Sequence, residues 1–401
     1  MNRSASPDNT KTSPRRIAIL GSTGSIGLQT LEVIAEANGL LQPVLLSAGH
    51  RVDALREQLE TMRQKHPSLL PERVVIIQPD QPLPDSTNDA ETNWLSGEQA
   101  QLDAIQELDL DLVLNGITGA AGLRASMTTL QAGIDLALAN KESLVTAGPL
   151  LTATARKSGA QILPVDSEHS AIQQCIADSA PATVQRIIIT ASGGPFRGFS
   201  TSELQQVTPE QALQHPTWKM GARISVDSAT LFNKTLEVIE AQQLFGTPPR
   251  GIEVLVHPQS IVHAIVEFQD GSSIAQLGEP DMKVPIRNAL FRGERPAGGY
   301  KALDLLGRGA STFEEVDAKA FPALDIGTIV LENPGTTLGA VLNAADEEAV
   351  AAFLAGDVGF LQIYDLVRRA LSEHSPTHVE NLEQVIAADQ ETRQRIRSWT
   401  T

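Results

Sequence analysis

A glycine-rich turn near the start of the chain is the feature that most constrains its fold. The apolar run Ile17–Leu20 leads directly into Gly21-Ser-Thr-Gly24-Ser-Ile-Gly27, and apolar residues at helical spacing follow. Glycines between a strand and a helix allow backbone N–H groups to approach a pyrophosphate at the positive end of the helix. The pattern therefore predicts a dinucleotide site. A tight turn without a ligand is the alternative.

Short apolar runs continue to alternate with helical stretches up to about residue 165, which predicts an α/β fold with a doubly wound, Rossmann-like parallel sheet. These runs are Val44–Leu46, Val74–Ile77, Leu112–Leu114, Ile134–Ala139 and Ile162–Val165. The polar segment Gln78–Gly97 is expected to cross the surface. Beyond it, an α+β region is predicted from strands at Arg186–Thr190, Glu253–Val256, Ile261–Phe268 and Ser273–Leu277. Three apolar stripes near the C-terminus predict a helical bundle.

Charge and cysteine content exclude several classes of protein. The 401 residues carry 31 Lys and Arg against 48 Asp and Glu, a net charge of −17, which argues against a nucleic-acid partner. A single cysteine, Cys175, excludes an internal disulfide framework and a cysteine-rich zinc site. No run approaches the ~18 apolar residues of a membrane span. The first fourteen residues lack the apolar core of a secretory signal. A cytoplasmic protein with no membrane partner is expected, with a disordered tail at residues 1–14.

The end of the second predicted strand bears on the choice of dinucleotide. It reads Ser47-Ala48-Gly49-His50-Arg51, and the first carboxylate comes only at Asp53. An NAD site usually has a carboxylate here for the ribose 2′-hydroxyl, whereas a cation suits a 2′-phosphate. Arg51 therefore favours NADPH. A solvated residue at the start of a helix is the alternative.

Two carboxylates follow the apolar run Ile162–Val165. Asp166 and Glu168 project to the same side of an extended chain, where they would repel each other unless a cation neutralised them. An all-oxygen site suits Mg²⁺ or Mn²⁺. The carboxyl end of a sheet strand, where α/β proteins bind ligands, supports this interpretation. A solvated strand end remains open as the alternative.

A second polar cluster follows Ser225. From Asn233 onward the spacing is helical, which places Asn233 and Glu237 on one face, so that Glu237 becomes a candidate third oxygen ligand. Lys234, Ser228 and Asn233 offer one charge and two hydrogen-bond donors to a phosphate. A capped, solvated helix is the alternative.

Two further segments carry candidate residues. Asn140-Lys141-Glu142 follows a buried run, so a lysine and a carboxylate again stand at a strand end. The segment His215–Gly221 holds Trp218 and Met220 between proline and glycine. An aromatic ring and a thioether in a loop predict a lid over a ligand, with local packing of a satellite core as the alternative.

Together these segments resemble one family, the 1-deoxy-D-xylulose 5-phosphate reductoisomerases. The resemblance runs from about Arg15 to the C-terminal helices. It rests on Gly21–Gly27, Leu138–Gly148, Leu163–Ile172, Ala191–Phe196, His215–Gly221, Ile224–Ala241, His257–His263 and Ala275–Met282.

The resemblance implies an NADPH- and Mg²⁺- or Mn²⁺-dependent enzyme of isoprenoid precursor synthesis that isomerises and reduces 1-deoxy-D-xylulose 5-phosphate to 2-C-methyl-D-erythritol 4-phosphate. It implies metal ligands at Asp166, Glu168 and Glu237. The implied catalytic residues are Lys141, Glu168, His215, Trp218, Met220 and His263. Substrate contacts are implied at Lys141, Ser167, Glu168, Ser192, His215, Ser228, Asn233, Lys234 and Glu237. Cofactor contacts are implied at Thr23, Gly24, Ser25, Ile26, Gly49, His50, Arg51, Asn140, Glu142 and Gly221.

The expected division is an NADPH domain at 15–165, a catalytic, metal-binding and dimerisation domain at 166–299, a linker at 300–323 and a helical domain at 324–401. A homodimer is expected. Two other functions stay open. A semialdehyde-type dehydrogenase would need an activated thiol at Cys175, which lies in a helical stretch with no adjacent base. The third is a non-catalytic nucleotide sensor.

Overall fold

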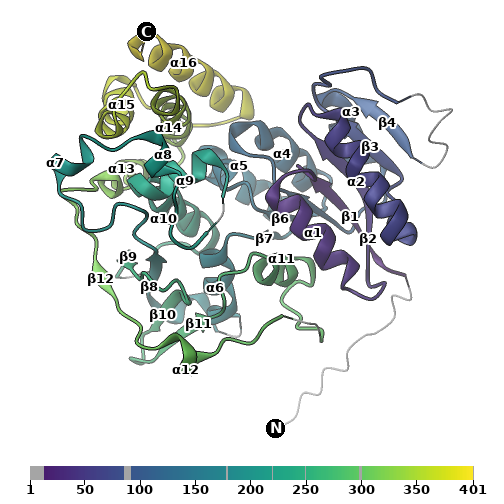
Figure 1. Cartoon of the computed structure of the whole chain (residues 1–401), viewed down its shortest axis with the longest axis horizontal. Helices are drawn as coiled ribbons and strands as arrows, with labels where there is room; N and C mark the ends of the chain where they lie inside the picture. Colours follow the sequence, from purple (N-terminus) through teal and green to yellow (C-terminus); the bar gives the residue numbers. More distant parts are fainter. Residues whose placement is uncertain are drawn as a thin grey trace. The chain divides into compact units, whose positions relative to one another are not determined.

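The computed structural model describes residues 13–84, 92–177, 179–218, 220–248, 250–297 and 300–400 (Figure 1). The predicted tail therefore lies almost wholly outside the described residues. The chain forms two compact units, Met1–Leu114 and Asn115–Thr401. Among the described residues no helix is both long and apolar enough to cross a membrane. The finer division into domains stays a prediction.

A seven-stranded sheet confirms the predicted α/β class. Its order is β4-β3-β2-β1-β5-β6-β7, and the pairs β1–β2, β2–β3, β3–β4 and β6–β7 are parallel. The apolar runs form these strands because the sheet buries them: Ile17–Leu20 are wholly inaccessible. The strands are β1 Arg15–Leu20, β2 Leu41–Ala48, β3 Arg73–Ile76, β4 Asn93–Ser96, β5 Leu112–Asn115, β6 Asp135–Leu138 and β7 Ile162–Pro164.

The first unit also contains α1 Ser25–Ala35, α2 Val52–Lys65, α3 Glu98–Glu107 and the short 3₁₀ turn η1 Pro67–Leu69. One strand of this unit was not predicted. The end of the polar segment Gln78–Gly97 is the edge strand β4, which pairs with β3 in register from Arg73 opposite Asn93. Backbone pairing with a buried neighbour outweighs the weak strand pattern of these four residues.

The second unit contains a five-stranded sheet of order β11-β10-β8-β9-β12. Its strands are β8 Val184–Ala191, β9 Ile252–Val256, β10 Val262–Phe268, β11 Ser273–Leu277 and β12 Glu314–Glu315. Only the pair β8–β9 is parallel among the pairs β8–β9, β8–β10, β10–β11 and β9–β12. The first four strands were predicted. One face of the sheet packs its apolar residues, such as Ile187, Ile189 and Val266, together with Ile172 of α6.

The second unit also contains most of the described helices. Three of them, α14, α15 and α16, form the predicted C-terminal bundle, in which α14 packs against both others and also against α5 and α9 (Figure 1). The helices are α4 Leu123–Gln131, α5 Lys141–Ser158, α6 Ser167–Ile176, α7 Thr201–Leu204, α8 Pro209–Ala212, α9 Ala222–Thr230, α10 Phe232–Phe245, α11 Lys283–Leu290, α12 Leu305–Arg308, α13 Ala323–Leu331, α14 Leu338–Ala355, α15 Phe360–Glu373 and α16 Leu382–Thr400, with 3₁₀ turns η2 Gly119–Gly122 and η3 Pro181–Thr183.

Candidate functional site

The carboxyl ends of β6 and β7 bring the first group of predicted site residues together. The two strands are parallel neighbours, with Leu138 opposite Pro164, so their ends lie at the same edge of the sheet. Helix α5 begins at Lys141 after a two-residue connection from β6, and α6 begins at Ser167 after a two-residue connection from β7. As a result the Lys141 ammonium contacts the Asp166 carboxylate directly.

The predicted extended conformation is correct at Asp166 (φ −61°, ψ 139°) and wrong at Glu168, which lies in the first turn of α6. Asp166 is the N-cap of α6, and its carboxylate accepts a hydrogen bond of 3.0 Å from the Ser167 backbone N–H. An aspartate directly before a helix satisfies the otherwise unpaired N–H groups of the first turn, and here it ends the extended segment. The two carboxylates still converge, because one caps the helix and the other lies in its first turn.

A break between α9 and α10 supplies the second group of site residues. Leu231 has a left-handed backbone (φ 65°), and α10 starts at the next residue. The Lys234 ammonium then contacts Glu168 and lies 2.6 Å from Glu237 Oε2. The Asn233 amide donates to Glu237 Oε1 at 2.6 Å. Lys141 Nζ reaches the same Oε1 at 3.2 Å.

These contacts form one buried group, which we call the carboxylate–lysine cluster: Lys141, Asp166, Glu168, Lys234 and Glu237. One oxygen from each carboxylate lies within 4.8 Å of the other two, and Glu237 is 1% exposed. When all three carboxylates are ionised, they outnumber the two ammonium groups by one charge. Oxygen-only donors, buried and short of positive charge, fit a hard divalent cation such as Mg²⁺ or Mn²⁺.

Protonation differs sharply within the cluster. Burial opposes ionisation of Asp166, but the Lys141 charge, then His169, lower its pKa to about 2. Burial, together with the Glu168 charge, raises the pKa of Glu237 to about 7 despite its two lysine neighbours. The difference arises because Glu237 faces another carboxylate as well as the lysines. A cation placed between the three would favour the ionised form of Glu237.

Two residues that the sequence analysis missed, His169 and Glu240, lie beside this cluster. The ring of His169 bonds through Nε2 to the Glu237 backbone carbonyl at 2.9 Å, and its Nδ1 lies 3.3 Å from Glu240 Oε2. Burial raises the pKa of Glu240 to about 7. The available signal was spacing: His169 stands three residues after Asp166, and Glu240 three after Glu237, which places each pair on one helix face.

His215 and Ser192 form a separate hydrogen-bonded pair. The backbone N–H groups of Thr217 and Trp218 donate to His215 Nδ1 at 3.1 and 2.9 Å, so the ring proton lies on Nε2, 2.9 Å from Ser192 Oγ. Burial, then the nearby Lys234 charge, lower the pKa of His215 to about 4. The imidazole is therefore neutral at neutral pH, and it orients the serine hydroxyl.

The remaining candidates of the second unit occupy the surrounding elements. A Cβ on Gly194 (φ 67°) would lie 2.8 Å from the Ser228 carbonyl, so this glycine allows the Ser192 loop to approach α9 closely. Trp218 and Met220 are both half-buried. His263 of β10 is buried, and desolvation, helped by the Lys234 charge, lowers its pKa although the Glu168 charge opposes this shift. The role of each remains a prediction.

The candidate cofactor residues divide between the units. In the first unit, Gly21 has a positive φ of 78°, and a Cβ on Gly27 would lie 2.4 Å from the Gly21 carbonyl, so the turn requires glycine. Gly24 and Ser25 are exposed, Thr23 and Ile26 are half-buried, and Gly49, His50 and Arg51 are exposed before α2. In the second unit, Asn140 and Glu142 flank the first residue of α5, and Gly221 is the N-cap of α9.

The geometry of Cys175 argues against the thiol-dependent alternative. This residue lies in α6 and is 6% exposed, and burial raises its pKa to about 11. A nucleophilic cysteine instead needs a lowered pKa and an exposed sulfur. Cys175 therefore acts as a core residue of the five-stranded sheet, where it packs with Ile172 and Val184.

Comparisons with known proteins agree with this geometry. Residues 17–148 match the family profile "1-deoxy-D-xylulose 5-phosphate reductoisomerase", and residues 162–245 and 277–395 match profiles of the C-terminal domains of that family. A 1-deoxy-D-xylulose 5-phosphate reductoisomerase of Xanthomonas campestris is 49% identical over 94% of this chain and 95% of its own length. That of Symbiobacterium thermophilum is 46% identical over 95% and 97%.

Solved structures give the same result. The Zymomonas mobilis reductoisomerase in complex with NADPH superposes with a TM-score of 0.86 at 39% identity, covering 97% of this chain and 99% of that one. A reductoisomerase in complex with NADPH, fosmidomycin and magnesium gives a TM-score of 0.87 at 36% identity, covering 96% and 98%. Near-complete coverage and this level of identity show that the chain belongs to the 1-deoxy-D-xylulose 5-phosphate reductoisomerase family.

Proposed function

We propose that this chain isomerises and reduces 1-deoxy-D-xylulose 5-phosphate to 2-C-methyl-D-erythritol 4-phosphate, with NADPH as reductant and Mg²⁺ or Mn²⁺ as the metal. Family membership supports the reaction. Structures of relatives in complex with NADPH and with magnesium support the choice of cofactors. The observation from this chain that carries the proposal is the carboxylate–lysine cluster, in which one oxygen from each of the three carboxylates lies within 4.8 Å of the other two.

Asp166, Glu168 and Glu237 are the proposed metal ligands. A divalent ion held there would polarise a ketone oxygen and stabilise negative charge on it during rearrangement. Lys141 lies in contact with Asp166 and 2.9 Å from Asn233 Oδ1, so its ammonium is positioned to hydrogen-bond a substrate hydroxyl or carbonyl beside the carboxylates. Burial of these groups strengthens each electrostatic contact, because little water competes with it.

The phosphate of the substrate would be held by Ser192, Ser228, Asn233 and Lys234. His215 keeps the Ser192 hydroxyl oriented through a 2.9 Å hydrogen bond, and Lys234 supplies the charge. The phosphate is remote from the reacting carbons, and its binding provides energy that orients those carbons. Trp218 and Met220, in the loop before α9, are the proposed lid that excludes water, and His263 is a further proposed active-site group.

NADPH would be bound by the glycine turn at Thr23–Ile26, by Gly49, His50 and Arg51, and by Asn140, Glu142 and Gly221. The absence of a carboxylate before Asp53, with Arg51 at the N-cap of α2, supports NADPH over NADH. We also propose that the protein is a cytoplasmic homodimer. The exposed strand β11 of the five-stranded sheet is consistent with pairing between subunits.

The proposal is tested by NADPH oxidation in the presence of 1-deoxy-D-xylulose 5-phosphate, with and without a chelator. Oxidation should require the sugar phosphate, stop when metal is removed, return on addition of Mg²⁺ or Mn²⁺, and be slower with NADH. Undiminished oxidation in chelator would contradict the metal role. NADPH binding without any oxidation would instead support the non-catalytic alternative.

A further inference from the structure

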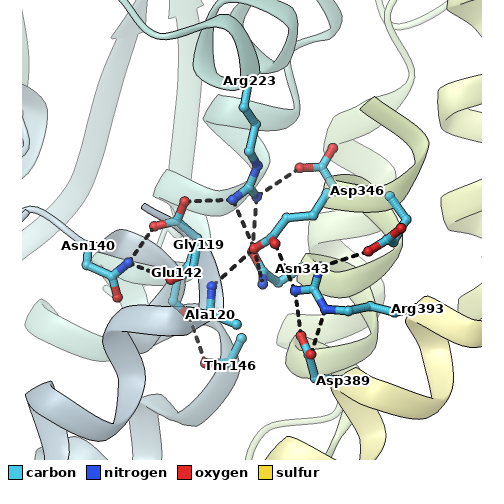
Figure 2. A network of polar contacts seen from close by, with 12 residues as sticks. Gly119, Ala120, Asn140, Glu142, Thr146, Arg223, Asn343, Asp346, Asp389 and Arg393 are labelled. Carbon is cyan, nitrogen blue, oxygen red and sulfur yellow. Dashed lines mark hydrogen bonds and ion pairs between the residues drawn. The ribbon is translucent and has the colours of Figure 1, made fainter. Parts of the chain in front are cut away.

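A second buried charge cluster surrounds Arg223, the second residue of α9 (Figure 2). Its guanidinium Nη1 donates to Glu142 Oε1 at 2.8 Å and to Glu347 Oε1 at 3.0 Å. Nη2 donates to Asn343 Oδ1 at 3.0 Å and to Asp346 Oδ2 at 3.2 Å. One side chain therefore joins the start of α5, the start of α9 and the middle of α14. We call this set the Arg223 network.

The anchor of this network is α14. Asn343 and Asp346 are fully buried, and both come from the face of α14 that meets α9. Glu347 is held in turn by Arg393 of α16 at 2.8 Å, by the Asn343 amide at 2.9 Å and by the Ala120 backbone N–H at 3.1 Å (Figure 2). Because four acceptors from two helices surround the Arg223 guanidinium, it has one well-defined position.

The functional end of the network is Glu142. Its second oxygen, Oε2, accepts from the Asn140 amide at 3.1 Å, and that amide also donates to the carbonyls of Ile117 and Gly119 at 2.6 and 2.8 Å. Arg223 thus holds Glu142, and through it Asn140, from the side of α14. Arg223 also lies two residues after Gly221, so the same contacts fix the start of α9 where the proposed lid loop ends.

We propose that Arg223 is a positioning residue for NADPH, with α14 as the fixed body against which it aligns Glu142, Asn140 and Gly221. The inference rests on the proposed cofactor contacts of those three residues. It gives the C-terminal helices a part in cofactor binding although none of their residues is a proposed ligand contact. A rigid guanidinium fork suits this task, whereas a lysine has one point charge on a flexible stem and cannot hold four acceptors in fixed directions.

The test compares Arg223→Lys with a matched control, Arg393→Lys. Both changes keep the charge and remove a guanidinium that contacts Glu347, but Arg393 pairs with Glu347, Glu348 and Asp389 and has no described contact with α5 or α9. NADPH affinity is measured by fluorescence titration, the KM for the sugar phosphate by steady-state kinetics, and stability by thermal unfolding. We expect Arg223→Lys to weaken NADPH binding about tenfold, while its KM for the sugar phosphate changes less than twofold.

Arg393→Lys should lower the unfolding temperature and leave NADPH affinity unchanged, because Glu347 keeps its hydrogen bonds from Arg223, Asn343 and the Ala120 backbone. If Arg223→Lys lowers stability to the same degree with NADPH affinity intact, the network is only structural and the inference is wrong. If Arg223→Lys does not fold, Asp346→Asn replaces it, because this change weakens the anchor and keeps the contact between Arg223 and Glu142. A several-fold loss of NADPH affinity is then expected, and no loss overturns the inference.

The unmodified protein separates this inference from the proposed function. If it binds NADPH and oxidises it with the sugar phosphate, the proposed function stands whatever the variants show. If it does not bind NADPH, the proposed function fails and the inference fails with it.

Discussion

The carboxylate–lysine cluster and the Arg223 network are both buried, both acidic and both within the second unit, yet they are built differently. The first balances three carboxylates with two lysines, and the carboxylate oxygens face one another within 4.8 Å. The second surrounds one guanidinium, and each of its donors at Nη1 and Nη2 has an assigned acceptor. A lysine ammonium is a point charge on a flexible stem, whereas an arginine is a planar fork.

This difference indicates what each cluster can do. In the first, a divalent cation can supply the charge that the two lysines now supply, so the carboxylates are available as ligands. In the second, removing the guanidinium would leave several buried acceptors without a hydrogen-bond donor, so replacement of the guanidinium by a cation is disfavoured. One buried acidic cluster is suited to binding and the other to holding geometry.

The sharpest test of this comparison is the same kind of isosteric change in each cluster. Glu237→Gln should reduce metal-dependent turnover by more than about 100-fold, because it removes a charged ligand from a buried site. Asp346→Asn, in the Arg223 network, should leave the metal concentration for half-maximal turnover unchanged. Turnover is measured across a titration of Mg²⁺ at saturating NADPH, with thermal unfolding as the control for folding. Equal metal dependence in Glu237→Gln and the natural chain would remove the distinction between the clusters.

A smaller effect is expected at Lys234, which pairs with Glu168 and Glu237. Lys234→Ala should raise the KM for the sugar phosphate roughly 10- to 100-fold, since a hydrogen bond to a charged group contributes about 1.5–3 kcal/mol. Because Lys234 also competes with a cation for the same carboxylates, the apparent affinity for Mg²⁺ should not fall. Steady-state kinetics at saturating NADPH measures both quantities. An unaltered KM would show that Lys234 pairs with the carboxylates and does not bind the phosphate.

The parts of the fold and of the site that could be predicted from the sequence are those in which residues close together in the chain carry the signal. The runs Ile17–Leu20 and Ile162–Val165 predicted strands because burial on both faces of a parallel sheet leaves a continuous apolar pattern. Asp166 and Glu168 stood out because they follow such a strand, and Glu237 because helical spacing linked it to Asn233. In each case a few neighbouring residues carried the signal, and the structure brings these residues together.

The Arg223 network was not predictable in the same way. Its acceptors Asn343, Asp346 and Glu347 lie 120 residues or more from Arg223 along the chain. No spacing rule joins α9 to α14, so the pairing emerges only from tertiary packing. The conformation at Glu168 was mispredicted for a related reason. The apolar pattern marks a strand but not its last residue, and the capping bond of Asp166 to Ser167 starts a helix one residue later.

The smallest expected effect is a pH dependence of stability that belongs to the Arg223 network. Burial raises the pKa of Asp346 from 3.8 to about 6, partly offset by Arg223. Burial, then the charge of Asp346, also raises the pKa of Asp227 well above its ordinary value. Between about pH 4 and pH 6 the folded protein therefore keeps a proton on Asp346 that the unfolded chain releases. Since the folded state binds more protons, the contribution of Asp346 to stability falls as pH rises through this window.

Asp346→Asn removes this titration and, by removing a neighbouring charge, lowers the pKa of Asp227 as well. Relative to the natural chain, the variant should therefore gain stability as pH rises from about 4 to 7, by on the order of 1–3 kcal/mol. Urea unfolding of both proteins at several pH values measures the difference, which separates the pH-dependent part from any constant cost of the substitution. A stability difference that stays constant with pH would contradict this prediction. It would mean that Asp346 is ionised throughout this pH range and forms an ordinary ion pair with Arg223.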